Sequence, residues 1–439
     1  MVGNLIPTTR EEVMMRFGKL SVLACALTLS LAACGRGGER PEGAGQGGQG
    51  LAGSIRVWIM EPGTPALKEF FEQATATFEK EHPQAEINLQ FVPWASAHDQ
   101  FITAIGGGQV PDLAEMGTTW TPEFSATGAL APIRGAQGRY LESLVEGATV
   151  DGRVYGLPWY AGARALIYRV DVFDRLGLEA PETWEELLTA GRAIRDRTDL
   201  FAFGVAGQGR HYFLPMVWQN GGQIAEQRKG RWVSRMDSPR AIQAIQFYAD
   251  LYAKERFVPE GALNWNPRDV RAAFEAGDLA MMIGGAWDVR AILAAHPELE
   301  GKLGTALLPK GPAGSRDTLA GGSHLVIFRE SREKELARAY AGFLLVPDRV
   351  AEFAEDLGFL PGTVEGLQRS RAAATKLFEP FATQLEGHSR TYPAIKEWGA
   401  LEGDPLFAAA VQEVMQGKKS AREAMGEVAD QMNAKFRDG

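Results

Sequence analysis

The chain of 439 residues is poor in cysteine: it has two, Cys25 and Cys34, and none after residue 34. A domain formed by the rest of the chain has no thiol, which excludes a disulfide framework and a cysteine nucleophile. A thiol-free domain suits an oxidising compartment.

Basic clusters and enzyme motifs are scarce as well. The chain has 46 Lys and Arg against 55 Asp and Glu, a net charge of −9, and no long basic run after its N-terminus. Nucleic-acid binding needs a clustered basic surface, so we expect no nucleic-acid partner. The sequence has no G-x-S-x-G, H-E-x-x-H, P-loop or EF-hand motif and no short internal repeat. We therefore expect no catalytic residue, no metal and no cofactor.

An apolar run near the N-terminus, Leu20–Ala33, has about 14 residues, too few to cross a bilayer as a helix. Arg16 and Lys19 precede this run, and a basic segment before a short apolar one predicts a secretory signal. An uncleaved anchor or a chance apolar stretch is the alternative. A signal does not need the polar, acidic residues that come first, which leaves Met14 or Met15 as alternative starts.

The run ends in Leu31-Ala32-Ala33-Cys34-Gly35, which resembles the bacterial lipobox. That resemblance implies a lipoprotein signal peptide over residues 1–33, cleavage before Cys34 and acylation of Cys34. The glycine-rich segment 34–53 follows without apolar periodicity and is typical of a flexible tether. The folded body is expected from Ser54.

The first part of the body alternates strands and helices. The apolar pattern predicts, in order, a strand over 55–60, a helix around 70–78, a strand over 87–91, a helix over 95–106 and a strand over 111–116. This order indicates a doubly wound α/β fold, in which ligands bind beyond the carboxyl ends of the strands. Residues 60–63 and 117–120 are expected at the mouth of such a site.

Further along, strands are expected within 154–168 and over 279–283, 302–308 and 320–327. Helices are expected to dominate from about residue 183 to residue 295, including 239–255 and 267–276, and again over 333–345 and through most of the tail. Thr183 and Glu186 predict a capping box at the start of another helix.

Six segments carry a family resemblance, and they occur in the family's order: VWIMEPG with FEKEHP, GGGQVPDLAEMGTTW, GLPWYAGARALIYRVDVFDRLGLEAPETWEEL, GDLAMMIGGAW, LAGGSHLVIF, and TYPAIKEWG with the segment after it. The body resembles the family 1 extracellular solute-binding proteins, the sugar-binding subunits of ATP-binding-cassette (ABC) importers. The resemblance covers nearly all of residues 54–439.

The resemblance implies an α/β periplasmic-binding-protein fold with two lobes, each a doubly wound sheet flanked by helices, and a ligand cleft at the hinge. One lobe would comprise 54–158 plus 320–362 and the other 160–318 plus 363–439. The lobes would close on a di- or oligosaccharide, which is then delivered to the membrane permease of an ABC importer. The protein would be exported, held at the cell membrane by its lipid anchor alone, facing the periplasm or the cell exterior, and monomeric.

Sugar binding needs aromatic platforms for the C–H face and polar groups for the hydroxyl rim. The predicted contacts are Glu61, Thr119, Trp120, Trp159, Tyr160, Trp218, Gly285, Trp287, Gly321, Gly322 and Trp398. Trp287 resembles the tryptophan of the family's Gly-Pro-Trp motif, with Ala286 in place of the proline. Trp398 resembles the family's aromatic residue after Tyr-Pro.

Each tryptophan also has an alternative role in core packing, which is favoured for Trp218 and equally weighted for Trp159. Gly321 and Gly322 either offer backbone amides to the ligand or form a turn with positive φ. His324 is expected in the core, and His211 is a weaker pocket candidate.

One position departs from the family pattern. The family often has Asp or Asn two residues after the hinge aromatic residue, where this chain has Gly162; the nearby Arg164 is retained. This loss puts the usual hydrogen bonds to the ligand in question.

Three other functions stay open on the sequence alone. A glycoside hydrolase needs two facing carboxylates, whereas most acidic residues here fall on helix faces. A non-sugar binder would need arginines for phosphate or several carboxylates for a polyamine, and a structural lipoprotein would bind no ligand.

Overall fold

The computed structural model describes residues 51–61, 65–136, 138–373 and 375–438. The predicted signal peptide, the lipidation site Cys34 and tether residues 34–50 lie outside the described residues. The first strand begins at Ala52, so the last two tether residues belong to the folded body. None of the helices in the described part of the chain is long and apolar enough to cross a membrane.

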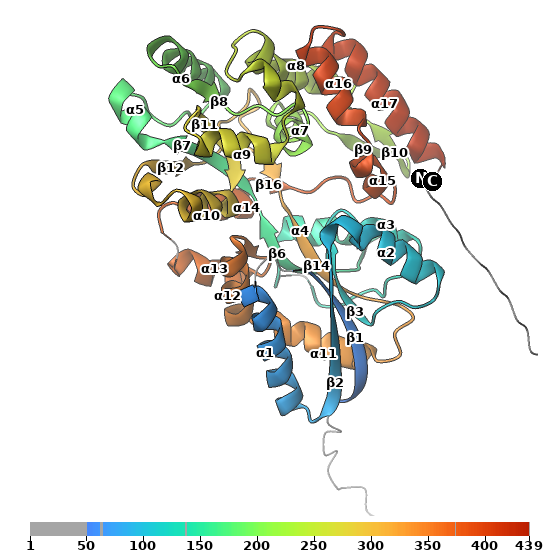
Figure 1. Ribbon diagram of the computed structural model, residues 1–439. Helices are drawn as coiled ribbons and strands as arrows, with labels where there is room; N and C mark the ends of the chain where they lie inside the picture. Colours follow the sequence, from blue (N-terminus) through green and yellow to red (C-terminus); the bar gives the residue numbers. More distant parts are fainter. Residues whose placement is uncertain (1–50, 62–64, 137, 374, 439) are drawn as a thin grey trace, which may run out of the picture. The chain divides into compact units, whose positions relative to one another are not determined.

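The first lobe is built on a six-stranded sheet (Figure 1). Its strands, in sheet order, are β15 (Leu360–Pro361), β6 (Leu157–Gly162), β14 (Gly321–Ile327), β3 (Leu113–Gly117), β1 (Ala52–Met60) and β2 (Gln84–Val92). β1 is parallel to both β2 and β3, while β14 runs antiparallel to β3 and β6. The predicted doubly wound pattern is confirmed.

Helices cover both faces of this sheet. They are α1 (Pro65–Glu81), α2 (Trp94–Gly106), α3 (Thr121–Ala126), α4 (Glu142–Gly147), α11 (Lys334–Leu344) and α12 (Pro347–Leu357). Ile55, Val57 and Ile59 of β1 share a core with α1, α11 and α12, whereas Met60 shares another with α2 and α3. Alternate residues of one strand thus point to opposite faces.

The second lobe is built on a four-stranded sheet with the order β12-β7-β11-β8. Its strands are β7 (Arg164–Arg169), β8 (Phe201–Phe203), β11 (Leu279–Gly285) and β12 (Leu303–Ala306). Its helices are α5 (Val170–Leu176), α6 (Trp184–Arg197), α7 (Arg210–Gln219), α8 (Pro239–Ala253), α9 (Pro267–Glu275), α10 (Ala286–Ala295), α14 (Glu379–Gly387), α15 (Trp398–Gly403), α16 (Leu406–Met415) and α17 (Ala421–Asp438), with short 3-10 helices at Glu260–Asn264 and Pro297–Leu299. Helix α13 (Val364–Ala373) packs mainly on α12 and β15 of the first lobe.

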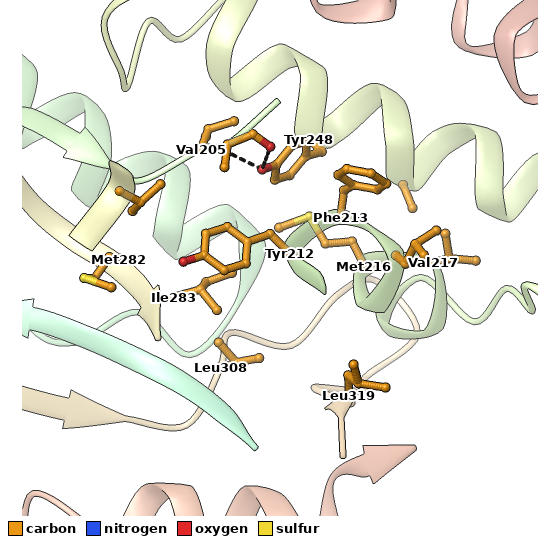
Figure 2. Close-up of a cluster of buried hydrophobic side chains, with 14 of the residues drawn as sticks. Val205, Tyr212, Phe213, Met216, Val217, Tyr248, Met282, Ile283, Leu308 and Leu319 are labelled. Carbon is orange, nitrogen blue, oxygen red and sulfur yellow. Dashed lines mark hydrogen bonds between the residues drawn. The ribbon is translucent and has the colours of Figure 1, made fainter. Parts of the chain in front are cut away.

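Helix α7 runs through the centre of this lobe, and Figure 2 shows its side chains among their neighbours. Residues 212–219 are all buried, as expected of a helix that is apolar all round. Tyr248 of α8 fixes the loop before α7, because its hydroxyl accepts from Ala206 N and donates to Ala206 O, at 2.8 and 2.9 Å. The N-terminus of α7, Arg210 and His211, is therefore held by a rigid core.

The sequence predicted most of these elements to within a few residues, with local differences. Thr183 does cap α6, accepting from Glu186 N at 3.2 Å. The carboxylate of Glu186, however, accepts from Glu182 N at 2.7 Å, so the predicted capping box closes one residue earlier. The short strand β8 and the hairpin of β9 (Ala225–Arg228) and β10 (Arg231–Ser234) fall in a region predicted to be mainly helical.

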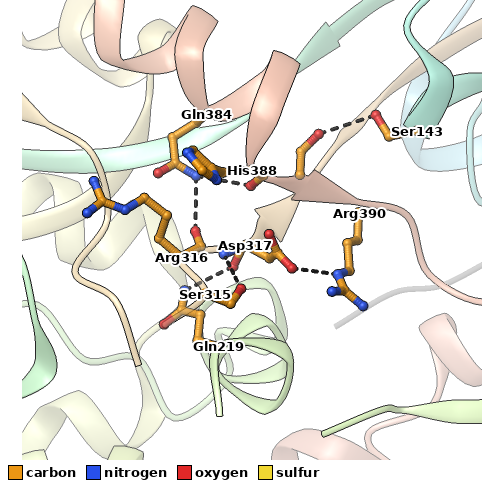
Figure 3. A network of polar contacts seen from close by, with 9 residues as sticks. Ser143, Gln219, Ser315, Arg316, Asp317, Gln384, His388 and Arg390 are labelled. Atoms are coloured by element: carbon orange, nitrogen blue, oxygen red, sulfur yellow. Dashed lines mark hydrogen bonds and ion pairs between the residues drawn. The ribbon is translucent and has the colours of Figure 1, made fainter. Parts of the chain in front are cut away.

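The chain passes between the two sheets at Ala163, at Ala320 and after Pro361. A polar network supports the second passage, where β13 (Thr318–Leu319) pairs with β16 (Ser389–Arg390) (Figure 3). Gln384 Nε2 donates to the carbonyls of Arg316 and His388, both at 3.1 Å, and Arg390 pairs with Asp317 at 2.5 Å. β6 belongs to the first sheet as far as Gly162. The residue limits given above for the two lobes stay a prediction.

Candidate ligand-binding cleft

A cavity of about 520 Å³ lies between the two lobes. It is lined by Trp94, His98, Gly117, Thr118, Thr119, Trp120, Gly162, Arg164, Arg210, His211, Trp287, Leu319, Gly321, Gly322, Phe359, Gly399 and Glu402. Its volume falls within the range of small-molecule sites. Five predicted contacts line it: Thr119, Trp120, Trp287, Gly321 and Gly322.

A larger cavity of about 1160 Å³ is lined by residues of 138–152 and 391–397 and by the β9–β10 hairpin. None of the eleven predicted contacts lines it. We therefore place the candidate site, called the cleft below, in the smaller cavity.

The wall formed by the first lobe is aromatic. It combines the N-terminal turns of α2 with the loop after β3, as expected for a site beyond the carboxyl end of a strand. The ring of Trp120 lies 5.5 Å from that of Trp94 and 5.3 Å from that of His98. His98 Nε2 lies 3.0 Å from Glu123 Oε2. The Trp94 side chain is 41% exposed, so this wall offers an accessible aromatic face.

Trp287 of the second lobe forms the floor of the cleft, and its ring packs against two glycines, Gly162 and Gly285. A Cβ at Gly162 would come within 2.2 Å of the Trp287 ring, and one at Gly285 within 2.3 Å. Any side chain at either position would displace the indole. Gly285 therefore supports Trp287 from below and does not itself line the cleft.

Phe359, between α12 and β15 of the first lobe, completes this floor, and its ring is stacked on that of Trp287 at 4.7 Å. α12 ends at Gly358, whose φ of 72° belongs to the left-handed conformation that glycine adopts readily. A Cβ at Gly358 would also lie 2.8 Å from Trp287 Cα. This turn directs Phe359 towards Trp287.

Charged groups from three elements meet at the cleft. Arg164 at the start of β7 has its guanidinium carbon 5.4 Å from the centre of the Trp287 ring. Arg210 Nη2 pairs with Glu402 Oε1 at 3.1 Å, and Arg210 Nη1 donates to the Glu402 carbonyl at 2.7 Å. His211 Nδ1 lies 2.8 Å from the hydroxyl of Tyr392. Burial, followed by the charges of Arg164 and Arg210, lowers the pKa of His211 well below its ordinary value, so we expect this imidazole to be neutral at pH 7.

Gly321 and Gly322 lie at the hinge edge of the cleft, and neither has a positive φ. The predicted alternative of a left-handed turn is therefore wrong. Gly322 is required because β6 approaches closely: a Cβ there would lie 2.1 Å from Tyr160 O. Its carbonyl accepts from Thr118 N at 3.0 Å, which fixes the loop that carries Thr119 and Trp120.

Beneath the hinge, the carboxylate of Glu115 on β3 is fully buried. Glu115 Oε1 accepts from the Tyr160 hydroxyl at 2.5 Å and the Ser323 hydroxyl at 2.7 Å, and Oε2 accepts from Met60 N at 2.9 Å. Burial raises the pKa of Glu115 to about 6, although the three hydrogen bonds oppose the rise. This carboxylate links four strands: β1, β3, β6 and β14.

Of the described residues, six predicted contacts do not line the cleft: Glu61, Trp159, Tyr160, Trp218, Gly285 and Trp398. Glu61 is exposed at the end of β1, and Trp159 is 1% exposed with its ring stacked on that of Phe353 at 4.7 Å. Trp398 is also 1% exposed and packs on Tyr392 at 4.6 Å, which in turn contacts Trp218 at 5.8 Å. Trp398 lines a small neighbouring cavity together with Thr118, Thr119 and Leu319, which also line the cleft. Ligand contact by these six residues stays a prediction.

Several lining residues were not among the predicted contacts. Trp94, His98, Arg210, Phe359 and Glu402 come from separate helices and a turn, and no single sequence motif joins them. Arg164, a retained residue of the family pattern, and His211, a weaker pocket candidate, also line the cleft. The sequence offers one signal for Arg164: it is retained, whereas the position two residues before it, which is often acidic in the family, is Gly162.

Comparison with known proteins decides the family. Residues 61–350 match the family described as bacterial extracellular solute-binding protein. The chain belongs to this family. Among its relatives is the diacetylchitobiose binding protein DasA of Streptomyces coelicolor, 27% identical over 427 residues, with 93% of this chain and 96% of DasA covered.

Solved structures of other solute-binding proteins agree with this fold. The sugar-binding protein MalE of Xanthomonas citri has a TM-score of 0.77 and 26% identity, covering 88% of this chain and 98% of its own. An ABC transporter solute-binding protein of Thermotoga lettingae, bound with α-D-tagatose, has a TM-score of 0.72 and 27% identity, covering 87% and 99%. This solute-binding protein therefore has the MalE-like two-lobed fold.

Proposed function

We propose that this solute-binding protein captures an extracellular sugar in the cleft and delivers it to an ABC importer. The observation that carries the proposal is a cavity between two lobes with an aromatic wall on one side and the Trp287–Phe359 platform on the other. Aromatic faces suit the C–H surface of a sugar, and the arginines, glutamate and backbone groups around them suit its hydroxyls. The names of relatives, which bind diacetylchitobiose or arabino-oligosaccharides, support a di- or oligosaccharide.

We further propose that the cleft binds without turnover. A glycoside hydrolase needs two carboxylates on opposite sides of the scissile bond. Among the described residues that line the cleft, Glu402 is the one carboxylate, and Arg210 already pairs with it. A glycosidase would release product from an oligosaccharide over time, whereas a receptor would reach stoichiometric saturation and release none.

The sugar itself is to be found by thermal-shift screening of mono- and disaccharides, followed by calorimetry on the hits. A ligand at 100 times its Kd adds about 2.7 kcal/mol to the free energy of unfolding. A saturable shift with one or a few sugars supports the proposal. No shift with any sugar, together with a shift by a polyamine or a phosphate ester, would favour the non-sugar alternative.

We also propose that the protein acts as a monomer, exported and tethered to the membrane through lipid on Cys34. The motif Leu31-Ala32-Ala33-Cys34 and the glycine-rich segment after it support this. Wild-type protein expressed in a bacterial host should incorporate labelled fatty acid, and Cys34→Ser should not. Absence of label from the wild type would contradict the anchor.

A further inference from the structure

The charges that face the cleft do not cancel. Of the lining residues, Arg164, Arg210, His98, His211 and Glu402 are ionisable. Glu402 pairs with Arg210, and His98 lies 3.0 Å from Glu123. In the part of the chain that the structure describes, Arg164 has no hydrogen bond or ion pair, and its guanidinium lies over the ring of Trp287. Among the described residues that line the cleft, it is the one arginine that no carboxylate contacts directly.

The charge of Arg164 opposes the rise that burial causes in the pKa of Asp288, but no ion pair or hydrogen bond joins these two described side chains. Asp288 Oδ2 accepts from Gly285 N at 2.9 Å and Asp288 Oδ1 pairs with Arg271 at 3.4 Å. Asp288 does not line the cleft, and its side chain is 13% exposed. Its carboxylate closes the capping box at the start of α10, so it is held away from the ligand.

Position 162 does not supply an acidic partner for Arg164 either, because it is a glycine. An acidic side chain at this position would stand two residues before Arg164 in the chain, but the Trp287 ring occupies the space that such a side chain would need. Arg164 is thus presented at the edge of an aromatic platform, with its donors available. A guanidinium recognises planar carboxylates through two parallel hydrogen bonds.

We infer that the cleft selects an acidic sugar, one whose ring carries a carboxylate, with Arg164 as the residue that recognises that group. This inference rests on the proposed function, which it narrows. A carboxylate is favoured over a phosphate because one unpaired guanidinium matches a single negative charge, whereas a phosphate ester carries up to two. Arg210 is already neutralised by Glu402 and offers no second cation.

The test compares matched ligands on the full chain by calorimetry. Glucuronate and galacturonate, as monosaccharides and as disaccharides, are each titrated beside the neutral sugar of the same stereochemistry and the 6-phosphate. We expect an acidic sugar to bind at least tenfold more tightly than its neutral partner. Tight binding of a neutral sugar with rejection of its uronate would overturn this inference and leave the proposed function standing. Binding of none of these sugars would overturn this inference, and the wider thermal-shift screen then decides the proposed function.

Variants at Arg164 assign the effect. Hydrogen bonds to a charged group are strong, so Arg164→Gln should weaken uronate binding about tenfold to a hundredfold, and Arg164→Lys should weaken it less. The affinity for the neutral sugar should fall less, because a hydrogen bond from Arg164 to a hydroxyl is weaker than one to a carboxylate. Arg197→Gln makes the same charge change at an exposed site on α6 and should leave both affinities unchanged. Equal losses for the neutral and acidic sugars in Arg164→Gln would show that Arg164 only supports the platform.

Discussion

Trp287 owes its place in the cleft to positions 162 and 285, which have no side chain. Its ring is half-buried, stacked on Phe359 and accessible to the cavity. Trp398, by contrast, is 1% exposed and packs against Tyr392 and Phe407. Both tryptophans are predicted ligand contacts, yet Trp287 lines the cleft and Trp398 is buried.

We expect Trp287→Ala to weaken sugar binding about thirtyfold to a hundredfold, because both the stacking and the buried apolar area are lost. Trp398→Ala should instead lower the free energy of unfolding by about 3–5 kcal/mol, as for a core tryptophan. Calorimetry with the cognate sugar and apo melting curves on both variants separate the two effects. A Trp287→Ala variant that melts early yet binds normally would assign Trp287 to the core.

The sequence could predict Trp120 and Trp287 because each follows a strand end, where ligands of α/β sheets bind, and the hinge glycines because they begin a strand at the cleft. It could not separate Trp287 from Trp159 and Trp398, because a platform and a core filler use the same side chain. Arg210 and Glu402 are separated by 192 positions along the chain. Only the packing of α7 against α15 brings them together, and no local pattern encodes that packing.

The hydrogen bonds of Glu115 join β1, β3, β6 and β14. Its buried environment makes the stability of the first lobe depend on pH. Because burial raises its pKa to about 6 from an ordinary value near 4.5, the native state binds more protons than the unfolded state between these values. The free energy of unfolding therefore falls as the pH rises from about 4.5 to above 6. A shift of this size corresponds to about 2 kcal/mol.

Glu115→Gln removes this titration and also disturbs the hydrogen bond from Met60 N. We expect the variant to be less stable than wild type at both ends of the range, and by about 2 kcal/mol more at pH 4.5 than at pH 7.5. Denaturant unfolding at the two pH values measures the difference. Glu86→Gln, at an exposed position of β2, is the matched control and should show no such change. A pH-independent penalty would contradict the raised pKa.

Whole elements were predictable where apolar periodicity was strong, as in β1, α1 and β11. The β9–β10 hairpin was not, since its strands read AEQR and RWVS and lack an alternating apolar pattern. Its fold depends on contacts with α17, where Asn433 Oδ1 accepts from Ser234 N at 2.8 Å. Because Ser234 and Asn433 are 199 positions apart, no pattern in the sequence of the hairpin predicts this contact.

For the two lobes together, we expect closure on the ligand, as in other periplasmic binding proteins. At one edge of the cleft α3 and α15 are in contact, since a Cβ at Gly399 would lie 1.9 Å from Glu123 Oε2. Without ligand we expect the lobes to part at this contact, so small-angle scattering should give a smaller radius of gyration with the cognate sugar than without it. Gly399→Ala should reduce this change and weaken binding, with little effect on the melting of the apo protein. Identical scattering profiles with and without a ligand of measured affinity would rule closure out.

The glycine at position 162 also constrains how this binding site can change in evolution. An aspartate there collides with the Trp287 ring, while loss of Trp287 alone removes the platform and returns no carboxylate. Gly162→Asp and Trp287→Ala should each impair binding, and their combination should be less harmful than the sum of the two, because the smaller residue makes room for the aspartate. A double-mutant cycle on sugar affinity would measure this coupling. An acidic residue at position 162, as the family often has, thus requires two substitutions. Whichever substitution comes first gives a protein that binds its sugar more weakly.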